Sequence, residues 1–361
     1  MSSLRKIRDR IHSVTATRQM TSSMKVVAVS RLKRKYAEFL KTIPFADEMN
    51  RVMRRLIRSI RERQENLARS GNDMQLSLPI LINGNGKDQR YVVVVVTSDD
   101  GLSGASSLQI LKQAQKTVDY LLTQKKNIHI FMYGARGGEI LQRLYPDIPV
   151  IIIKQKHYQK VKTYLNAERI AVNIIESFHQ NRFDVCLIVY NQFKSIVSQV
   201  PVVEQIVPNK IFLKDNPWGF LTEKTEAEYI RSDSLGRKKI TLKQSQFLSA
   251  IGGVDILPSL QGAVFRSDLS GGKRLPFVYD YEPLDTALLE MMLPQYLTAY
   301  IYRVLLETEV SDNAARLMAM DNATRNAGDM LNTLNRLYRR ERQTRITTDI
   351  AEVSVGSVQG G

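Results

Sequence analysis

The feature that most constrains the fold is a stripe of residues near the C-terminus that keeps helical spacing over an unusual length. Its members recur at intervals of three and four and their sums: Leu289, Leu293, Tyr296, Tyr300, Glu307, Val310, Ala314, Leu317, Ala327, Leu331, Leu334 and Tyr338. Such spacing is typical of a coiled coil. As one helix, residues 295–352 would extend about 87 Å at 1.5 Å per residue. A helix of that length must project beyond any domain this chain can build.

A second long helix is predicted at the N-terminus. Leu4, Ile7, Ile11 and Val14 mark one helical face. The stripe then resumes at Met20, Met24, Ala28, Leu32, Met49, Leu56 and Ile60. Residues 1–69 contain no glycine and a single proline, Pro44, where we expect a kink. Because no local segment covers this face, we expect the two terminal helices to pack together.

The charge is concentrated in the N-terminal helix. The chain carries a net charge of +16, and residues 1–69 hold 18 Lys/Arg against 6 Asp/Glu. Residues 286–361 hold 8 Lys/Arg against 9 Asp/Glu, so we expect that the C-terminal helix cannot neutralise the positive charge of residues 1–69, which we call the basic arm. A basic arm implies an acidic partner: nucleic acid, an anionic membrane surface or an acidic protein. No aromatic residues alternate with the basic residues of the tract Arg31, Lys33, Arg34 and Lys35. This favours a solvated helix face over a nucleic-acid-binding site.

Between the helices the pattern alternates between strands and helices. Strands are predicted at 91–97, 128–133, 148–153 and 184–190, helices at about 105–125, 137–145 and 158–181, and an antiparallel edge strand at 197–207. This alternation predicts a Rossmann-like α/β domain with a mainly parallel sheet. We therefore divide the chain into an N-terminal coiled-coil helix (1–69), the α/β domain (70–208), an insertion and return segment (209–283) and a C-terminal coiled-coil helix (284–361).

The residues give no indication of catalysis. The loop Asp99–Gly104 offers only Gly-x-x-Gly, and its two aspartates would repel a phosphate, so we interpret it as a structural turn, with a nucleotide site as the alternative. The histidines lack metal-ligand spacing: His12, His129, His157 and His179. We expect no catalytic residue, metal or cofactor. Cys186, in an apolar run, is expected to be buried, and no apolar run approaches the ~18–20 residues that cross a bilayer.

Several motifs closely resemble those of F-type ATP synthase gamma subunits. The segment Ala314–Ala327 (AARLMAMDNATRNA) resembles the signature helix of that family, Arg342–Glu352 its closing motif, and Met24–Leu32 its N-terminal helix motif. Leu293–Leu297 and Thr97–Gly104 also match, so the resemblance spans nearly the whole chain except the insertion. The chain departs from the family pattern at Asp100, Ser103, Asp349 and Ser357. The insertion has no cysteine, which excludes a thiol switch like that of the chloroplast relatives.

The resemblance implies a fold and a function. In that family the terminal helices form an antiparallel coiled coil inside a ring of alternating alpha and beta subunits. The α/β domain lies at the base, against the epsilon subunit and the membrane c-ring. The resemblance thus implies a rotating, non-catalytic central-stalk subunit that couples proton flow to the conformational cycling of the catalytic beta subunits, with the coupling ion left open. It also implies a peripheral position on the cytoplasmic face of a bacterial inner membrane, or on the matrix face of an organelle membrane.

The resemblance assigns residues to these contacts. The predicted contacts with the catalytic subunits are Met24, Lys25, Arg31, Arg342, Gln343 and Thr347. The predicted coiled-coil seam comprises Ile7, Ile11, Met24, Val310, Leu317, Leu331 and Leu334, and Arg325 is expected on the outer face. Lys25 and the tract 31–35 are expected to face acidic loops of the ring. Two alternatives stay open on the residues alone: a basic coiled-coil nucleic-acid-binding protein, and an α/β enzyme with a ligand at the 99–104 loop.

Overall fold

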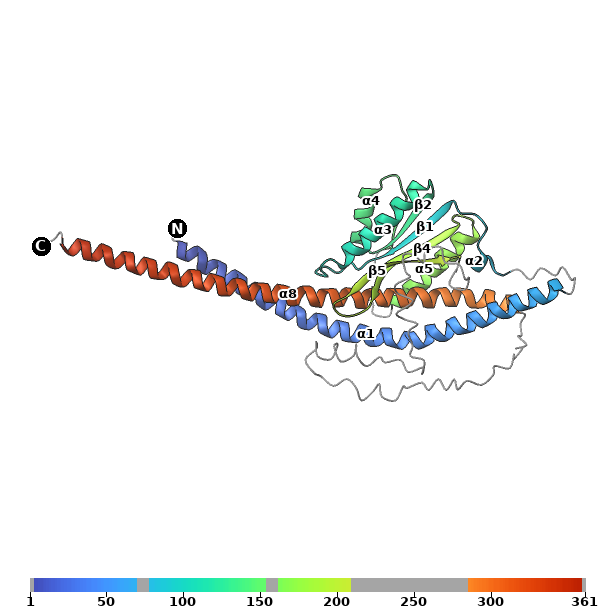
Figure 1. The fold of residues 1–361 in the computed structure, drawn as a ribbon, viewed down its shortest axis with the longest axis horizontal. Coiled ribbons are helices and arrows are strands. Elements are labelled where there is room, and N and C mark those ends of the chain that lie inside the picture. Colours follow the sequence, from blue (N-terminus) through green and yellow to red (C-terminus); the bar gives the residue numbers. More distant parts are fainter. Residues whose placement is uncertain (1–2, 70–77, 154–161, 209–284, 359–361) are drawn as a thin grey trace, which may run out of the picture. The chain divides into compact units, whose positions relative to one another are not determined.

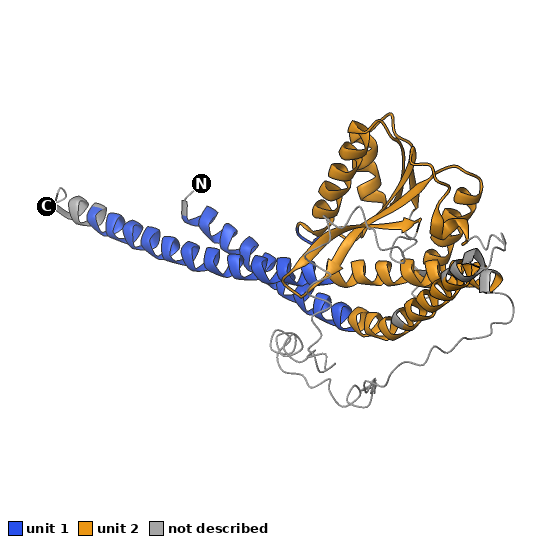
Figure 2. Cartoon of the chain, turned by 45° about the vertical axis from the view of Figure 1, so that its right-hand side comes forward, with its two compact units in different colours: residues 1–33, 102–104, 313–361 blue, residues 34–101, 105–312 orange. Residues whose placement is uncertain are grey.

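A computed structural model describes residues 3–69, 78–153, 162–208 and 285–358 of the chain. Its elements, in chain order, are α1 (Ser3–Arg69), α2 (Ile80–Asn83), β1 (Arg90–Val96), α3 (Ser106–Thr123), β2 (Asn127–Tyr133), α4 (Ala135–Leu144), β3 (Val150–Ile153), α5 (Lys162–His179), β4 (Val185–Phe193), β5 (Gln199–Val207) and α8 (Asp285–Val358) (Figure 1). Figure 2 shows the two compact units: unit 1 holds residues 1–33, 102–104 and 313–361, and unit 2 holds residues 34–101 and 105–312.

Both predicted long helices are present. The helix α1 has 67 residues and contains Pro44, whereas α8 has 74 residues and contains Pro294. The C-terminal helix begins at Asp285, so it includes the whole span 295–352 considered above and the start of the predicted stripe at Leu289, and the kink at Pro44 stays a prediction. Within the described part of the chain, no helix has the length and apolar character together that a bilayer crossing requires.

The central sheet confirms the predicted α/β class. Its strand order is β3-β2-β1-β4-β5, in which β1 pairs in parallel with β2 and β4, β2 pairs in parallel with β3, and β5 is antiparallel to β4 at one edge. The strand predicted at 197–207 forms this edge, beginning at Gln199. The predicted insertion and the first residues of the predicted 158–181 helix lie outside the described residues. The boundaries of the four predicted segments remain predictions.

The strand β1 shows why the sheet needs cover on both faces. Val92, Val94 and Val96 join one core cluster with residues of α5, α1 and α8, whereas Val93 and Val95 join a second cluster with residues of α3 and α4. Figure 1 shows α3 and α5 on opposite sides of the sheet. A continuous apolar strand is what a parallel sheet covered twice demands. Parts of both long helices therefore belong to the core of unit 2.

Cys186 lies in the middle of this core. It follows the first residue of β4 and is fully buried, as predicted. Burial among apolar side chains raises the pKa of its thiol, because the thiolate would be poorly solvated there. Cys186 is thus an unreactive part of the core under ordinary conditions.

Candidate partner-binding coiled coil

Unit 1 contains a helix pair built from the first half of α1, up to Lys33, and the part of α8 that begins at Asn313. Two polar contacts across the pair define its geometry: Arg8 Nη2 donates to the Tyr338 hydroxyl at 3.0 Å, and Lys25 Nζ lies 2.7 Å from Asp321 Oδ1. From Arg8 to Lys25 the chain advances 17 residues, and from Tyr338 to Asp321 it goes back 17 residues. The two helices therefore run antiparallel in a constant register.

The predicted seam residues divide by burial. Val310, Leu317, Leu331 and Leu334 on α8 are at most 8% exposed. On α1, Ile7, Ile11 and Met24 are only half-buried. Ala28 and Leu32, which belong to the same N-terminal stripe, are almost completely buried. Burial thus increases along α1 from its first turns toward Leu32. The seam assignment itself stays a prediction.

Lys25, a predicted contact of the catalytic subunits, is already paired within the chain. Its ammonium group contacts one carboxylate oxygen of Asp321, and Arg325 Nη2 lies 2.7 Å from the other oxygen. The hydrogen bond from Lys25 lowers the pKa of Asp321, and the charges of Lys25 and Arg325 add to that effect. Asp321 was not among the residues predicted from the sequence. Its position four residues before Arg325 was the available signal, since residues at that spacing share a helix face.

Two lysines of the basic N-terminal helix are paired with acidic residues of α8, while the expectation that the C-terminal helix cannot neutralise the whole excess of 18 Lys/Arg over 6 Asp/Glu stays a prediction. Besides the pair at Lys25, Lys35 Nζ lies 2.9 Å from Glu309 Oε2 of α8 and 3.0 Å from Glu38 Oε2 of its own helix. Two of the acidic residues of α8 thus lie opposite lysines of α1. A count of charges over a whole segment cannot reveal such pairing, because it ignores which residues face each other.

The remaining predicted contact residues lie at the surface. Arg31, Arg342, Gln343 and Thr347 are all exposed, and the Thr347 hydroxyl donates to the backbone carbonyl of Gln343 at 2.9 Å. Arg325, expected on the outer face, has a side chain 75% exposed. Five arginines gather in this stretch of α8 and all are exposed: Arg336, Arg339, Arg340, Arg342 and Arg345. Residues 336–347 of α8 therefore present a basic and largely exposed surface.

The crevice where an α/β sheet commonly binds a ligand is filled by the chain itself. The neighbours of β1 place the topological switch point between β1 and β4. At the end of β4, Asn191 Nδ2 donates to the backbone oxygen and the hydroxyl of Ser106, at 3.3 and 2.9 Å. The Ser311 hydroxyl of α8 donates to the Asn191 carbonyl at 3.1 Å. All three residues are buried, so side chains occupy this place.

The neighbouring loop has the character of a structural turn. Asp99 Oδ1 accepts a hydrogen bond from the backbone N–H of Arg136, 3.3 Å away, in the first turn of α4. A carboxylate of the loop thus lies at the N-terminus of α4, where the helix dipole favours negative charge. This contact favours the structural interpretation of the loop over the nucleotide-site alternative.

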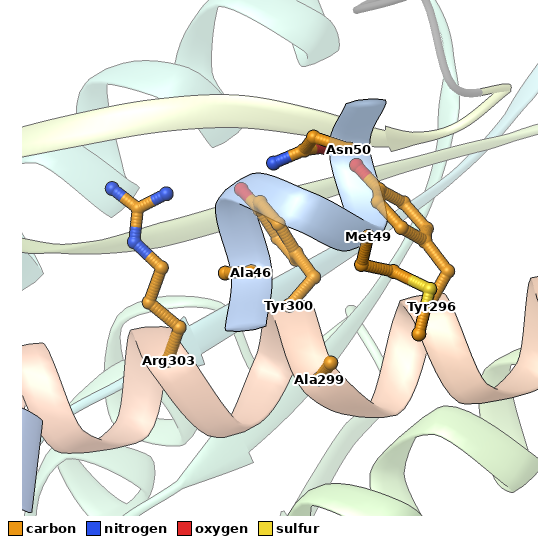
Figure 3. A pocket seen from close by; sticks show the side chains of 7 residues that line it. All are labelled: Ala46, Met49, Asn50, Tyr296, Ala299, Tyr300 and Arg303. Atoms are coloured by element: carbon orange, nitrogen blue, oxygen red, sulfur yellow. The ribbon is translucent and has the colours of Figure 1, made fainter. Parts of the chain in front are cut away.

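A small cavity lies between α1 and α8 within unit 2 (Figure 3). It is lined by Ala46, Met49, Asn50, Tyr296, Ala299, Tyr300 and Arg303. Its volume is about 10 Å³, enough for about one water molecule. A cavity of this size has no room for a cofactor or a metabolite.

Comparison with known proteins identifies the family. A family model described as ATP synthase matches residues 3–358, nearly the whole chain. The ATP synthase gamma chain of Rhizobium etli is 32% identical over 359 residues, covering 99% of each chain. That of Paracoccus denitrificans is 32% identical over 357 residues, with the same coverage. The chain therefore belongs to the ATP synthase gamma chain family.

One solved structure with a similar chain is that of the central stalk and c-ring of the Tetrahymena thermophila mitochondrial ATP synthase. The similar chain is 19% identical and has a TM-score of 0.49, with 84% of this chain and 99% of that chain covered.

Proposed function

We propose that this chain is the rotating central-stalk subunit of an F-type ATP synthase. In this role it couples proton flow through a membrane c-ring to the conformational cycling of the catalytic beta subunits. The observation that carries the proposal is the antiparallel helix pair, held in one register by the contacts at Arg8 and Lys25, in a chain of the gamma family. Such a pair is a rod with an internal seam and a polar exterior, as a shaft requires.

The mechanism needs no bond chemistry from this chain. The beta subunits carry out the ATP reaction, and the shaft is a non-catalytic subunit. Its exterior differs from side to side, so each of three otherwise equal catalytic sites meets a different surface and takes a different conformation. When the shaft turns, each site passes through these conformations in order. The coupling is therefore a difference in interaction free energy between states of the catalytic sites.

The partners of the chain follow from this role. The alpha and beta subunits surround the helix pair, and the epsilon subunit and the c-ring bind the α/β domain. The complex is peripheral to the cytoplasmic face of a bacterial inner membrane or the matrix face of an organelle membrane. Contacts with the ring fall to Met24, Lys25, Arg31, Arg342, Gln343 and Thr347. The exposed basic groups among them suit acidic loops, since charge attraction guides association without demanding one fixed geometry.

Co-expression with the alpha and beta subunits of the same source tests the proposal. We expect size-exclusion chromatography to yield one complex containing all three chains, and we expect the purified complex to turn an attached bead when it hydrolyses ATP. A chain that elutes alone, and that binds DNA or RNA with a steep dependence on salt, would favour the basic nucleic-acid binder instead.

A further inference from the structure

One face of α8 in unit 2 carries three polar side chains that bond the β4–β5 hairpin. The Tyr300 hydroxyl donates to the carboxylate of Glu204 on β5. Glu307 Oε1 accepts a hydrogen bond from the backbone N–H of Phe193 at 3.1 Å, and the Ser311 hydroxyl donates to the Asn191 carbonyl at 3.1 Å. Tyr300, Glu307 and Ser311 lie two turns and then one turn apart along the helix. We call these three residues the polar ladder.

One backbone carbonyl of the sheet, that of Asn191, requires a hydrogen-bond donor from outside the sheet. Asn191 lies beyond the last pair between β1 and β4, which is Val95 with Val189. On its other side, Asn191 is opposite Pro201 of β5, which has no N–H to donate. The Asn191 carbonyl therefore lacks these partners in the sheet, although a buried carbonyl requires a donor. Ser311 of α8 supplies that donor.

Because these hydrogen bonds are buried, they restrict the rotation of α8 about its own axis. Glu307 is 3% exposed and Ser311 is fully buried, so a bond lost by a change in helix setting cannot be replaced by water. The apolar contacts around them favour burial but not one particular rotation, because the hydrophobic effect is non-directional. The contact between Arg303 Nε and Glu307 Oε2, 3.9 Å apart, lies within α8 itself and therefore does not restrain this helix against the sheet.

We propose that the polar ladder fixes the rotational setting of α8 on the α/β domain, so that turning force passes between that domain and the shaft helix through Tyr300, Glu307 and Ser311. The inference rests on the proposed function, since it assigns positioning residues for the transmission of rotation. The helix α8 is continuous from the ladder to residue 358, and it therefore carries the force onward along its own backbone.

The experiment measures torsional stiffness in the complex with alpha and beta subunits. The ring is fixed to a surface, and a bead is attached at Gln124→Cys, an exposed position at the end of α3. The native Cys186 is buried and does not compete for the bead. The angular variance of the bead is recorded during catalytic pauses. The ladder variants are Tyr300→Phe, Glu307→Leu and Ser311→Ala, each of which removes one bond.

Two control variants match these changes. In Thr308→Val a buried hydroxyl is lost, but that hydroxyl bonds the Val304 carbonyl of its own helix and no strand. In Glu307→Gln the side-chain oxygen that accepts from Phe193 is kept. We expect each ladder variant to raise the angular variance, by at most about 1.5-fold, because one of three bonds acting in parallel is gone while the rest of the shaft keeps its own stiffness. Both controls should keep the parental variance.

The outcomes separate the inference from the function on which it rests. If the parental complex turns its bead and the ladder variants are as stiff as the controls, the ladder does not set the rotation of α8. A lower melting temperature without any change in angular variance also overturns the inference, since it indicates a structural role alone. A parental complex that never turns overturns the proposed function and the inference together.

Discussion

Lys25 of α1 and Asp321 of α8 form an ion pair across the helix pair, 2.7 Å between Nζ and Oδ1, although they are 296 residues apart in sequence. The Lys25 side chain remains 41% exposed. It therefore has two candidate partners, one within the chain and one in the proposed ring. An exposed pair of this kind contributes roughly 0–1 kcal/mol to stability.

Charge reversal separates these two roles. We expect Lys25→Glu to impair ATP-driven proton pumping by the assembled complex more than ATP hydrolysis, because the catalytic sites stay intact. The double variant Lys25→Glu/Asp321→Lys restores opposite charges within the helix pair. If the ring contact is the important one, pumping should remain impaired in the double variant. Recovery of pumping would instead assign Lys25 to the helix pair alone.

Leu317 and Arg325 give a matched pair on α8. Leu317 is 5% exposed, so Leu317→Asp places a carboxylate where water cannot reach it, at a cost of several kcal/mol. We expect this variant to lose assembly with the alpha and beta subunits. Arg325→Ala removes an exposed partner of Asp321, worth less than about 1 kcal/mol, and should assemble normally. Size-exclusion chromatography checks both, and equal tolerance would show that the seam is misassigned.

Glu307 makes stability depend on pH near neutrality. Burial raises its pKa to about 7, with a contribution from Glu204, while Arg303 and the N–H of Phe193 oppose the rise. The folded chain thus holds the proton more tightly than the unfolded chain, whose pKa is about 4.3. The stabilisation is complete below the unfolded-state pKa and is lost as the pH rises through 7, by about 4 kcal/mol in all.

The variant Glu307→Gln checks this dependence, because an amide does not titrate. We expect the free energy of unfolding of the parent, relative to this variant, to fall between about pH 4 and pH 7 and then to level off. Chemical denaturation at a series of pH values measures the difference. A difference that stays constant over this range would mean that Glu307 does not take up a proton on folding.

Asp184 ties the start of β4 to the start of β1. Its buried carboxylate accepts hydrogen bonds from Arg90 Nη2 and Asn85 Nδ2, both at 2.7 Å, and from the backbone N–H groups of Gln89 and Arg90. Burial by itself would raise the pKa of Asp184, but these bonds hold the pKa well below its ordinary value. We expect Asp184→Ala to reduce the free energy of unfolding by roughly 2–4 kcal/mol at pH 7, because the hydrogen bonds to a charged, buried acceptor are lost.

The sign of its pH dependence is opposite to that of Glu307. A depressed pKa contributes stability that is present above the unfolded value of about 3.9 and is lost as the pH falls through the folded-state pKa. The difference between parent and Asp184→Ala should therefore shrink below about pH 4. Glu48→Ala is the control, because Glu48 is 58% exposed beside Arg51 and its ion pair is worth less than about 1 kcal/mol. Equal losses in both variants would contradict the importance of the buried carboxylate.

Periodicity predicts the faces of elements but not which residues meet across them. The spacing of Leu317, Leu331 and Leu334 marks the buried side of α8, because a helix repeats every 3.6 residues. The valines of β1 likewise indicate a strand that is covered twice. In contrast, sliding α1 along α8 by a whole turn would leave both stripes intact. The hydrophobic periodicity therefore could not predict the pairing of Lys25 with Asp321.

The polar contacts at the end of β4 were missed for a related reason. Asn191 and Ser311 are ordinary polar residues in their own segments, and neither carries a motif. Their importance arises only when the strand register places Asn191 opposite Pro201 and beyond the end of the β1 pairing. That register is a property of three strands and a helix together. The sequence of a single segment therefore cannot reveal this register.

The constant register of the helix pair also limits which insertions and deletions the two helices can accept. A residue added to α1 between Arg8 and Lys25 would displace every contact beyond it, unless α8 gained a residue between Asp321 and Tyr338. Length changes in the two arms must therefore occur in matched pairs, although the arms are encoded at opposite ends of the coding sequence. Surface loops of the α/β domain tolerate changes of length more readily, because they connect elements without being part of a long paired register. We expect homologous chains to vary in length between the arms while the arms keep theirs.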